Sequence, residues 1–226
     1  MPSRAQLLSD HGSVLVLDAA SSQVQVGLLR AGLPDRWRRA AVEAGTGIFV
    51  ETDRLFRDEG FDLERTGAFA YCEGPGSSLG IRTVAMAIRT WQALRPRPAF
   101  AYQSLAVAGR LAWTQSHHAV AVVADARRET WHCQVTDEAG RPGPLTRKTA
   151  ADLPAGELLT PADFRRWSAL PRPLTPCSYD LAVIFPALGD DDYFHPVTSP
   201  DVFQHEAPEY RKWAAQVHQA PVTPRR

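Results

Sequence analysis

Two aspartates stand where a phosphate-binding turn would need them. Asp18 ends the apolar run 14–18 (VLVLD), and Asp125 ends the run 119–125 (AVAVVAD), 107 residues later (125 − 18). A short polar turn follows each run and leads into a second strand-like stretch. Such a turn after a buried strand suits an anion, because successive backbone N–H groups point at its oxygens. The alternative is that both acids simply end strands and cap turns.

The two turns lack the residue that this chemistry favours. Close approach of the backbone to phosphate favours glycine, which tolerates positive φ. The turns read 18–22 (DAASS) and 125–129 (DARRE), and neither contains glycine. Arg127 and Arg128 would attract an anion, whereas Glu129 would repel it. We infer the scaffold of a phosphate-binding ATPase in which both phosphate-binding turns are degraded.

The glycine-rich segment 74–80 (GPGSSLG) is a second candidate site for an anion. It precedes a helical pattern, and the N-terminus of a helix attracts anions. However, it lacks both the Lys-Ser/Thr ending of a P-loop and the GxGxxG spacing. A tight turn that directs the next helix, with Ser77 or Ser78 as the N-cap, is the competing interpretation.

Other reactive residues lack the spacing of a site. The histidines form no metal-ligand pattern, and adjacent residues on a strand point to opposite faces. Ser77 is not in a GxSxG elbow. We therefore predict no catalytic residue and no metal site, having considered His117, His118, His132 with Cys133, His195 and His205.

The remaining periodicity predicts the elements around these turns. Residues 14–29 and 119–136 each predict a hairpin, 68–71 a strand, and 48–60, 78–94 and 105–113 helices. The segment 180–188 is either a strand or a short helix. Pro96 and Pro98 suggest a lobe boundary, so we expect an N-terminal lobe over 1–98 and a smaller, degenerate lobe over 99–226.

The overall composition narrows the class of protein. The 226 residues include 25 basic and 25 acidic ones, so the chain has no net basic field to collect nucleic acid. Its three cysteines are widely spaced, which argues against a disulfide framework and fits a reducing cytoplasm. No apolar run approaches the roughly 20 residues that span a bilayer, so we expect no membrane association.

Four segments together resemble the TsaB family, also called YeaZ. The stretch 74–82 (GPGSSLGIR) is similar to the family's GPGSFTGLR, and DAASS and DARRE resemble its two hairpin turns. The stretch 207–211 (APEYR) resembles its closing P-x-Y-x-R. Ser78 and Leu79 depart from the usual Phe-Thr.

This resemblance implies an α/β protein with the actin-like ATPase (RNase H-like) fold, two lobes each with a mixed sheet flanked by helices. It also implies a non-catalytic subunit that supports TsaD and works with TsaE in forming threonylcarbamoyladenosine beside the anticodon of ANN-decoding tRNAs. No cofactor is expected, and any ATP would lie at a complex interface or on TsaE. A homodimer is possible, and tRNA would be met only through the complex.

The alternative function is an actin-like ATPase or kinase, or a glycoprotease-type peptidase, acting on its own. The family motifs place a vestigial nucleotide or partner site at Asp18, Ser21, Gly74, Pro75, Gly76, Ser77, Gly80, Arg82, Asp125 and Arg127. The helix pair 48–60 and 78–94 is the expected partner surface, with Leu55, Val84, Ile88 and Trp91 as candidate contacts.

Overall fold

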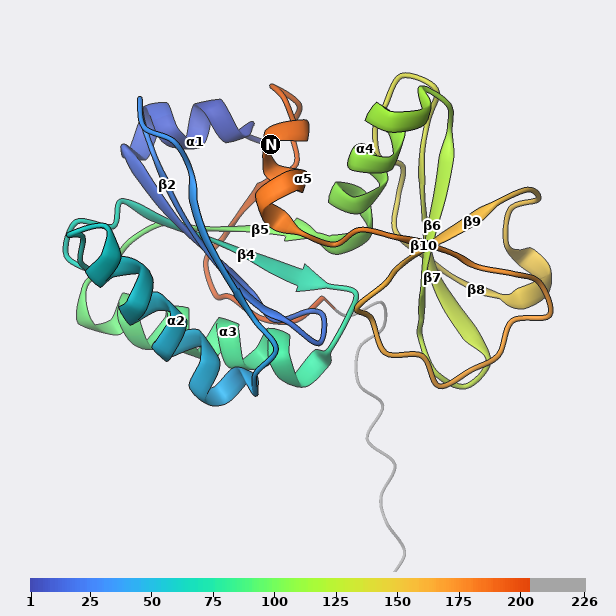
Figure 1. Ribbon diagram of the computed structural model, residues 1–226, viewed down its shortest axis with the longest axis horizontal. Helices are drawn as coiled ribbons and strands as arrows, with labels where there is room; N and C mark the ends of the chain where they lie inside the picture. The colour runs from blue at the N-terminus through green and yellow to red at the C-terminus, as the bar shows by residue number, and fades with distance from the viewer. Residues whose placement is uncertain (204–226) are drawn as a thin grey trace, which may run out of the picture.

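The first aspartate hairpin forms the centre of a six-stranded sheet. In the computed structural model, which describes residues 1–203, β1 (Ser13–Asp18) pairs antiparallel with β2 (Val24–Arg30), and β2 with β3 (Arg36–Ala40). On the other side, β4 (Ala68–Gly74) and β5 (Ala99–Gln103) run parallel to β1. The short β11 (His195–Val197) completes the order β11-β5-β4-β1-β2-β3 (Figure 1).

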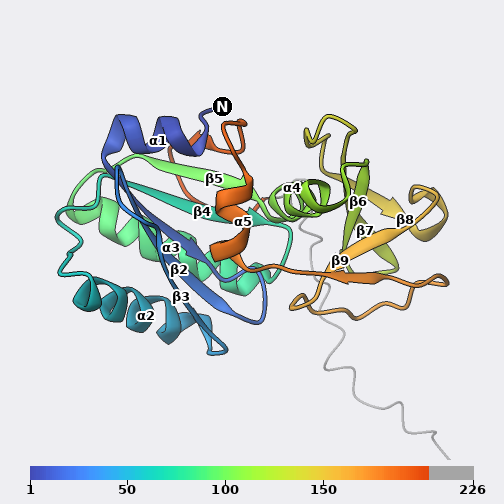
Figure 2. The ribbon, with the colours of Figure 1, turned by 45° about the horizontal axis from the view of Figure 1, so that its top comes forward.

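Helices cover both faces of this sheet, and the alternation of the strands explains why. Leu15 and Leu17 pack under α2 (Ala44–Asp58) and α3 (Ser78–Leu94). Val14 and Val16 point to the opposite face, which α1 (Arg4–His11) and α5 (Leu181–Ala187) cover (Figures 1 and 2). Because successive side chains alternate between faces, a strand buried on both sides is apolar throughout, as β1 is.

The second aspartate hairpin forms the centre of a smaller, five-stranded sheet. It is built from β6 (Val120–Asp125), β7 (Thr130–Thr136), β8 (Thr146–Thr149), β9 (Leu158–Pro161) and β10 (Thr175–Cys177), in the order β10-β9-β6-β7-β8. Helix α4 (Ser104–Ser116) packs on one face of it. The other face carries a small apolar cluster beside the 3-10 helix η1 (Ala150–Asp152).

The chain passes between the two lobes twice. β5, β11 and α5 all follow residue 98 but belong to the first lobe, so a boundary at 98 does not follow the sheets. The prolines that suggested this boundary, Pro96 and Pro98, lie in the loop between α3 and β5, and both of these elements belong to the first lobe. One apolar cluster contains Val16 of the first sheet and Val122 of the second, so the two lobes share a continuous core.

Most predicted elements are present, including both hairpins and α3 over residues 78–94. The segment 180–188 contains the helix α5, which Asp180 caps through the N–H of Ala182. Helix α1 was not expected from its polar sequence; Ser3 and Gln6 form its capping box. None of the helices in the described part of the chain is both long and apolar enough to cross a membrane.

Candidate functional site

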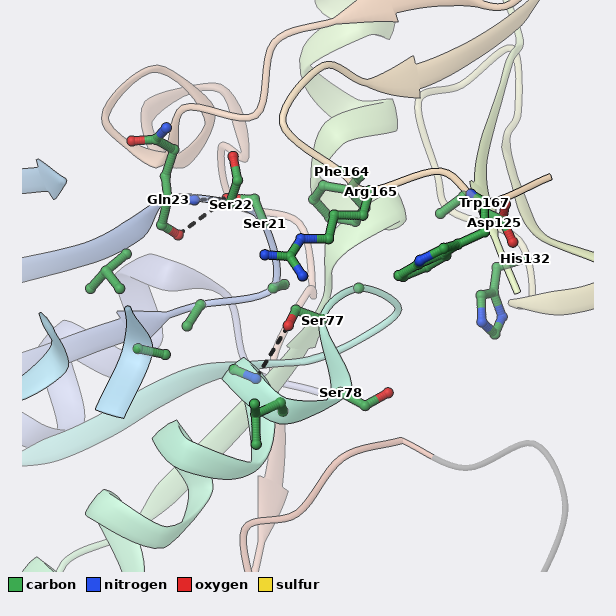
Figure 3. A pocket seen from close by; sticks show the side chains of 18 of the residues that line it. Ser21, Ser22, Gln23, Ser77, Ser78, Asp125, His132, Phe164, Arg165 and Trp167 are labelled. Atoms are coloured by element: carbon green, nitrogen blue, oxygen red, sulfur yellow. Dashed lines mark hydrogen bonds between the residues drawn. The ribbon is translucent and has the colours of Figure 1, made fainter. Parts of the chain in front are cut away.

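A pocket of about 420 Å³ lies between the two lobes (Figure 3). The two aspartate turns, the N-terminal ends of α2 and α3, and the loop between β9 and β10 meet there. Its lining includes Ser21, Ser22, Gln23, Glu43, Gly76, Ser77, Ser78, Asp125, Arg127, His132, Arg165 and Trp167.

The glycines of the GPGS segment let α3 approach the first turn closely. A Cβ atom on Gly76 would lie 2.4 Å from the carbonyl oxygen of Ala20, and one on Gly80 would lie 2.0 Å from that of Ala19. Ser77 donates its N–H to the Ala20 carbonyl over 2.7 Å. The Ser77 hydroxyl in turn accepts the N–H of Gly80, which caps the helix. Both glycines therefore serve close backbone packing.

The other motif residues divide between support and surface. The Pro75 carbonyl accepts the hydroxyl of Ser104, which anchors the start of α4, and Gly74 ends β4. Ser21 lines the pocket, where its hydroxyl bonds the backbone of Gln23. Arg82 is exposed on the first turn of α3 and lies outside the pocket lining.

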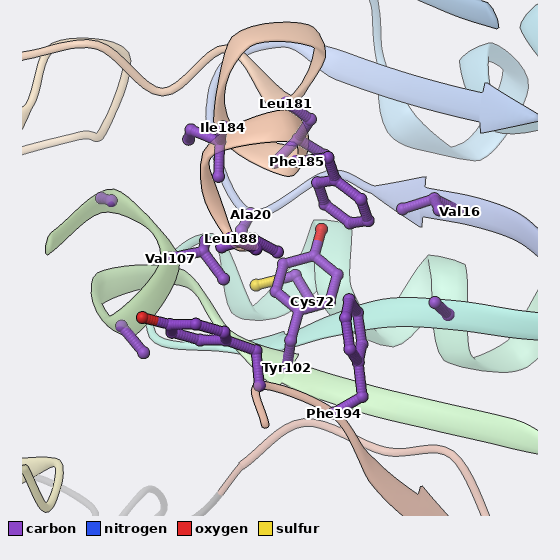
Figure 4. Packing of buried hydrophobic residues seen from close by; sticks show 14 of the residues in the cluster. Val16, Ala20, Cys72, Tyr102, Val107, Leu181, Ile184, Phe185, Leu188 and Phe194 are labelled. Atoms are coloured by element: carbon purple, nitrogen blue, oxygen red, sulfur yellow. The ribbon is translucent and has the colours of Figure 1, made fainter. Parts of the chain in front are cut away.

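Asp18 is sealed inside the first lobe and does not line the pocket. One carboxylate oxygen accepts the Ala20 N–H, and the other accepts the hydroxyls of Tyr102 and Tyr179, each over 2.7 Å. Burial raises the pKa of this carboxyl group above its ordinary value, against these hydrogen bonds. Figure 4 shows Tyr102 and Cys72 packed among the apolar side chains of the surrounding core.

Asp125 ends β6 in the equivalent position but lies at the edge of the pocket. Its carboxylate accepts three backbone N–H groups, those of Arg127, Trp167 and Ser168, over 2.5–2.7 Å. Burial opposes ionisation, yet these donors outweigh it, and the pKa of Asp125 is lower than usual. Asp125 thus holds the second turn and the β9–β10 loop together.

The second turn has an unusual backbone. Arg127, Arg128 and Glu129 have φ angles of 64°, 50° and 59°, the left-handed region that side chains disfavour. Hydrogen bonds between Ala126 and Thr130 and between Thr130 and Arg127 hold this conformation. The sequence identified Arg127 but missed Arg165 and Trp167, which lie in a proline-rich stretch without periodicity. The only available signal was an aromatic residue directly after two arginines, RRW at 165–167.

The thiols are not activated. Burial raises the pKa of Cys72 and Cys133, and it raises that of Cys177 to about 12. A nucleophilic cysteine needs the opposite shift. Within residues 1–203 there is also no group of three or more His, Cys, Asp or Glu side chains placed to hold a metal ion. His205 lies outside the described residues.

Three of the four candidate partner contacts need correction. Leu55, Val84 and Ile88 are at most 3% exposed, because the stripe that they form packs on the sheet. Trp91 is half-buried and stacks on Phe69. The regular apolar stripe marked the core-facing side of the helices. Their exposed apolar residues are Phe49, Val50, Leu79, Met86 and Leu94.

Two mixed sheets built around equivalent hairpins define the actin-like (RNase H-like) α/β fold. YeaZ from Pseudomonas aeruginosa superposes with a TM-score of 0.63 over 79% of this chain and 91% of its own, at 17% identity. An uncharacterised protein with similarity to peptidase YeaZ from Pseudomonas aeruginosa gives 0.58 over 66% and 74%, at 20% identity. The resemblance to YeaZ is thus confirmed at the level of the fold.

No protein-family model matches the sequence, and neither does any curated protein. The similarity of this chain to known proteins therefore rests on its three-dimensional structure. The segment 207–211, which supplied the fourth motif of the resemblance, lies outside the described residues.

Proposed function

We propose that this chain is a TsaB-like, non-catalytic partner subunit of a cytoplasmic complex that forms threonylcarbamoyladenosine in ANN-decoding tRNAs. The observation that carries the proposal is an apolar outer surface on α2 and α3, in a protein with the YeaZ fold. In this proposal the TsaD homologue performs the chemistry, the TsaE homologue supplies ATPase activity, and tRNA is bound only by the assembled complex.

The outer side of α3 carries exposed apolar side chains beside its exposed arginines, Arg82 and Arg89. Leu79, Met86 and Leu94 are 74%, 55% and 79% exposed. Thr83 and Thr90 lie between them at helical spacing, and their hydroxyls donate to the carbonyls of Leu79 and Met86. These bonds satisfy the hydroxyls within the helix, so the threonines add little that a partner would have to desolvate. An exposed apolar stripe with this spacing suits helix-to-helix packing.

Helix α2 extends the same surface. Phe49 is 45% exposed and Val50 is 36% exposed, and the Phe49 ring meets Trp91 of α3 edge-on at 5.9 Å. The two helices lie side by side on one face of the first sheet (Figure 2). Aromatic and apolar anchors of this kind dominate the centres of protein interfaces. We propose that two helices of the TsaD homologue complete a four-helix contact here, which a second copy of this chain would occupy in its absence.

The thiol chemistry supports a non-catalytic role over a thiol peptidase, because the pKa values of all three cysteines are raised rather than lowered. For an ATPase acting alone, the buried Asp18 would have to leave the two tyrosine hydroxyls that hold it before it could act on a nucleotide.

Reconstitution tests the proposal. Purified TsaD and TsaE homologues from the same organism would be mixed with an ANN-decoding tRNA, threonylcarbamoyl-AMP and ATP, with and without this chain. We expect modified nucleoside, measured by mass spectrometry, only when the chain is present, and no ATP or peptide hydrolysis by the chain alone. Equal yield without the chain, or robust hydrolysis by the isolated chain, would contradict the proposal.

A further inference from the structure

A second pocket, of about 730 Å³, lies at the junction of the two lobes and shares no lining residue with the pocket between the aspartate turns. The end of β5, the start of α4, strand β7 and the loops that follow β7 and α5 surround it. Helices α4 and α5 pack against each other beside it (Figure 1). Its volume lies in the range of small-ligand sites.

Gln134 gives this pocket a buried acceptor that lacks a donor. The residue lines the pocket and is 3% exposed. Its amide NH₂ group donates to the side-chain oxygen of Gln103 over 2.8 Å and to the Gly143 carbonyl over 2.9 Å. Its own amide oxygen accepts no hydrogen bond from any residue of 1–203. A buried acceptor without a donor is unfavourable, so a ligand that supplies an N–H group there gains affinity.

A chain of hydrogen bonds fixes the orientation of this amide. The Gln103 amide NH₂ group donates to one oxygen of the buried Glu73 carboxylate over 3.3 Å, and the other oxygen lies 3.1 Å from Nε2 of His195. Because a carboxylate only accepts, Gln103 presents its oxygen to Gln134, which therefore presents its NH₂ group. Turning the Gln134 amide over would place its oxygen against the oxygens of Gln103 and Gly143. The group without a partner is thus an acceptor.

Acidic side chains add negative charge to the same pocket. Asp190, Asp191 and Asp192 all line it. Asp191 pairs with Arg110 over 2.9 Å. Asp190 and Asp192 are exposed, and neither carboxylate forms an ion pair within the described part of the chain. Two carboxylates are therefore available to a ligand.

The cations of the lining do not cancel this charge. Arg141 pairs with Asp137 over 3.2 Å, and His195 lies against Glu73. The ammonium group of Met1, a lining residue, forms no ion pair within residues 1–203. One ammonium group thus stands against two unpaired carboxylates, so the pocket keeps a negative charge and favours a cation.

We propose that this pocket binds a small organic cation with primary ammonium groups, of the diamine or polyamine class. One ammonium group donates to the amide oxygen of Gln134, and another interacts with the carboxylates of Asp190 and Asp192. An ammonium group has three N–H donors and no acceptor, which suits a pocket whose unpaired groups are mainly acceptors. Pro142 and Pro144 supply apolar wall for the methylene spacer of such a ligand.

An organic cation fits the pocket better than a metal ion does. Residues 1–203 contain no group of three or more His, Cys, Asp or Glu side chains placed to hold a metal. A hard divalent cation needs several oxygen ligands that converge on one point. The proposal does not depend on the proposed function, because no residue of α2 or α3 lines this pocket.

Titration calorimetry on the full chain tests the proposal, with putrescine and spermidine as probes. The comparisons are Mg²⁺ and neutral 1,4-butanediol, which has the same carbon spacer as putrescine. We expect at least one amine to bind about tenfold or more tightly than the diol and than Mg²⁺. Its affinity should fall as the salt concentration rises, because salt screens the exposed carboxylates.

Variants locate the binding. Gln134→Met keeps a similar volume but removes the acceptor, and it should weaken amine binding about fivefold or more. Asp190→Asn combined with Asp192→Asn should weaken it by a similar factor, and the exposure of both residues keeps the fold intact. Asp10→Asn is the matched control, because Asp10 is an exposed acid on α1 that does not line the pocket. It should change the affinity less than about twofold.

Four results would overturn the proposal. The first is the absence of amine binding at millimolar concentration, and the second is binding of the diol or of Mg²⁺ as tightly as the amines. The third is unchanged affinity in either pocket variant, with thermal unfolding showing that the variant is folded. The fourth is equal weakening by Asp10→Asn, which would show a diffuse charge effect. If Gln134→Met does not fold, the paired aspartate variant still decides the question.

Discussion

The two aspartate hairpins occupy equivalent places in their sheets but differ in what covers them. Asp18 pairs with Gln25 across the first hairpin, as Asp125 pairs with Trp131 across the second. The chain that returns to the first lobe places Tyr179 and α5 over the first turn. The Tyr179 hydroxyl donates a hydrogen bond to the Asp18 carboxylate. At the second turn, Asp125 holds the β9–β10 loop through the backbone N–H groups of Trp167 and Ser168.

This difference shows that a repeated local motif does not fix a repeated role. At the first turn, the Asp18 carboxylate is buried in the core, and small side chains such as Ser21 and Ser22 line the pocket. At the second turn the carboxylate fastens a loop, and the pocket received Arg127, Arg165 and Trp167. We interpret the first hairpin as part of the core of the first lobe and the second as the anchor of the β9–β10 loop.

The largest expected effect is that of Asp18→Ala. The substitution leaves two buried tyrosine hydroxyls and one buried N–H without their acceptor, so we expect a loss of about 3 kcal/mol in the free energy of unfolding. Tyr179→Phe, which removes a single hydroxyl, should lose about 1 kcal/mol. Urea denaturation measures both. A loss below that of Tyr179→Phe for Asp18→Ala would contradict the structural role.

Asp125→Ala should have a smaller and more local effect. The freed N–H groups of Trp167 and Ser168 lie near the surface, where water replaces the carboxylate, so we expect a loss of about 1.5 kcal/mol. Hydrogen exchange by mass spectrometry should show faster exchange in peptides covering residues 165–168 and unchanged exchange in β1 and β4. Faster exchange throughout the first lobe would argue against this division.

The two carboxylates should affect stability with opposite dependence on pH. The pKa of Asp18 is raised above the ordinary 3.8, so its favourable contribution is complete below that value and is lost as pH rises through its folded-state pKa. The pKa of Asp125 is lowered, so its contribution is complete above 3.8 and is lost as pH falls through its folded-state pKa. The measurement is the unfolding free energy of wild type minus that of Asp18→Asn, and of Asp125→Asn, between pH 3 and 7. Curves of the same slope would refute the contrast.

The smallest effect concerns the backbone of the second turn. Arg128 has a φ of 50°, so Arg128→Gly relieves left-handed strain and should stabilise the chain by about 0.5 kcal/mol after the added flexibility of the unfolded chain is included. Ser22→Gly in the first turn, where φ is not positive, should destabilise by a similar amount. Thermal unfolding compares the two. Stabilisation by both glycines would show that the turns do not differ in strain.

Sequence patterns correctly predicted the helices and strands whose periodicity can be read from neighbouring residues. The alternating strands of both hairpins and the 3.6-residue stripe of α3 predicted their positions, because burial on one face imposes that periodicity. The GPGS segment was correctly placed between a strand and a helix. Its role in close packing depends on Ala19 and Ala20, and no pattern within the segment itself reveals those neighbours.

Properties that depend on distant contacts were beyond the sequence. Asp18 is buried by Tyr102 and Tyr179, which lie 84 and 161 residues away along the chain. Leu55, Val84 and Ile88 formed a clear stripe, but the stripe alone does not tell a core face from a partner face. The exposed residues Leu79 and Met86 were not selected because they fall outside the regular stripe. Arg165 and Trp167 lie in an irregular loop whose position depends on Asp125.

The most direct test of the proposed function is the affinity of the chain for the TsaD homologue of the same organism, measured by titration calorimetry. Wild type should bind with micromolar or tighter affinity. Met86→Glu, which places a charge at the centre of the α2–α3 surface, should abolish binding while its unfolding free energy stays within about 0.5 kcal/mol of wild type. Val183→Glu is the matched control, since Val183 is 51% exposed on α5 at the opposite face of the sheet, and it should bind as wild type does. Unchanged binding by Met86→Glu, or no binding by wild type, would contradict the account.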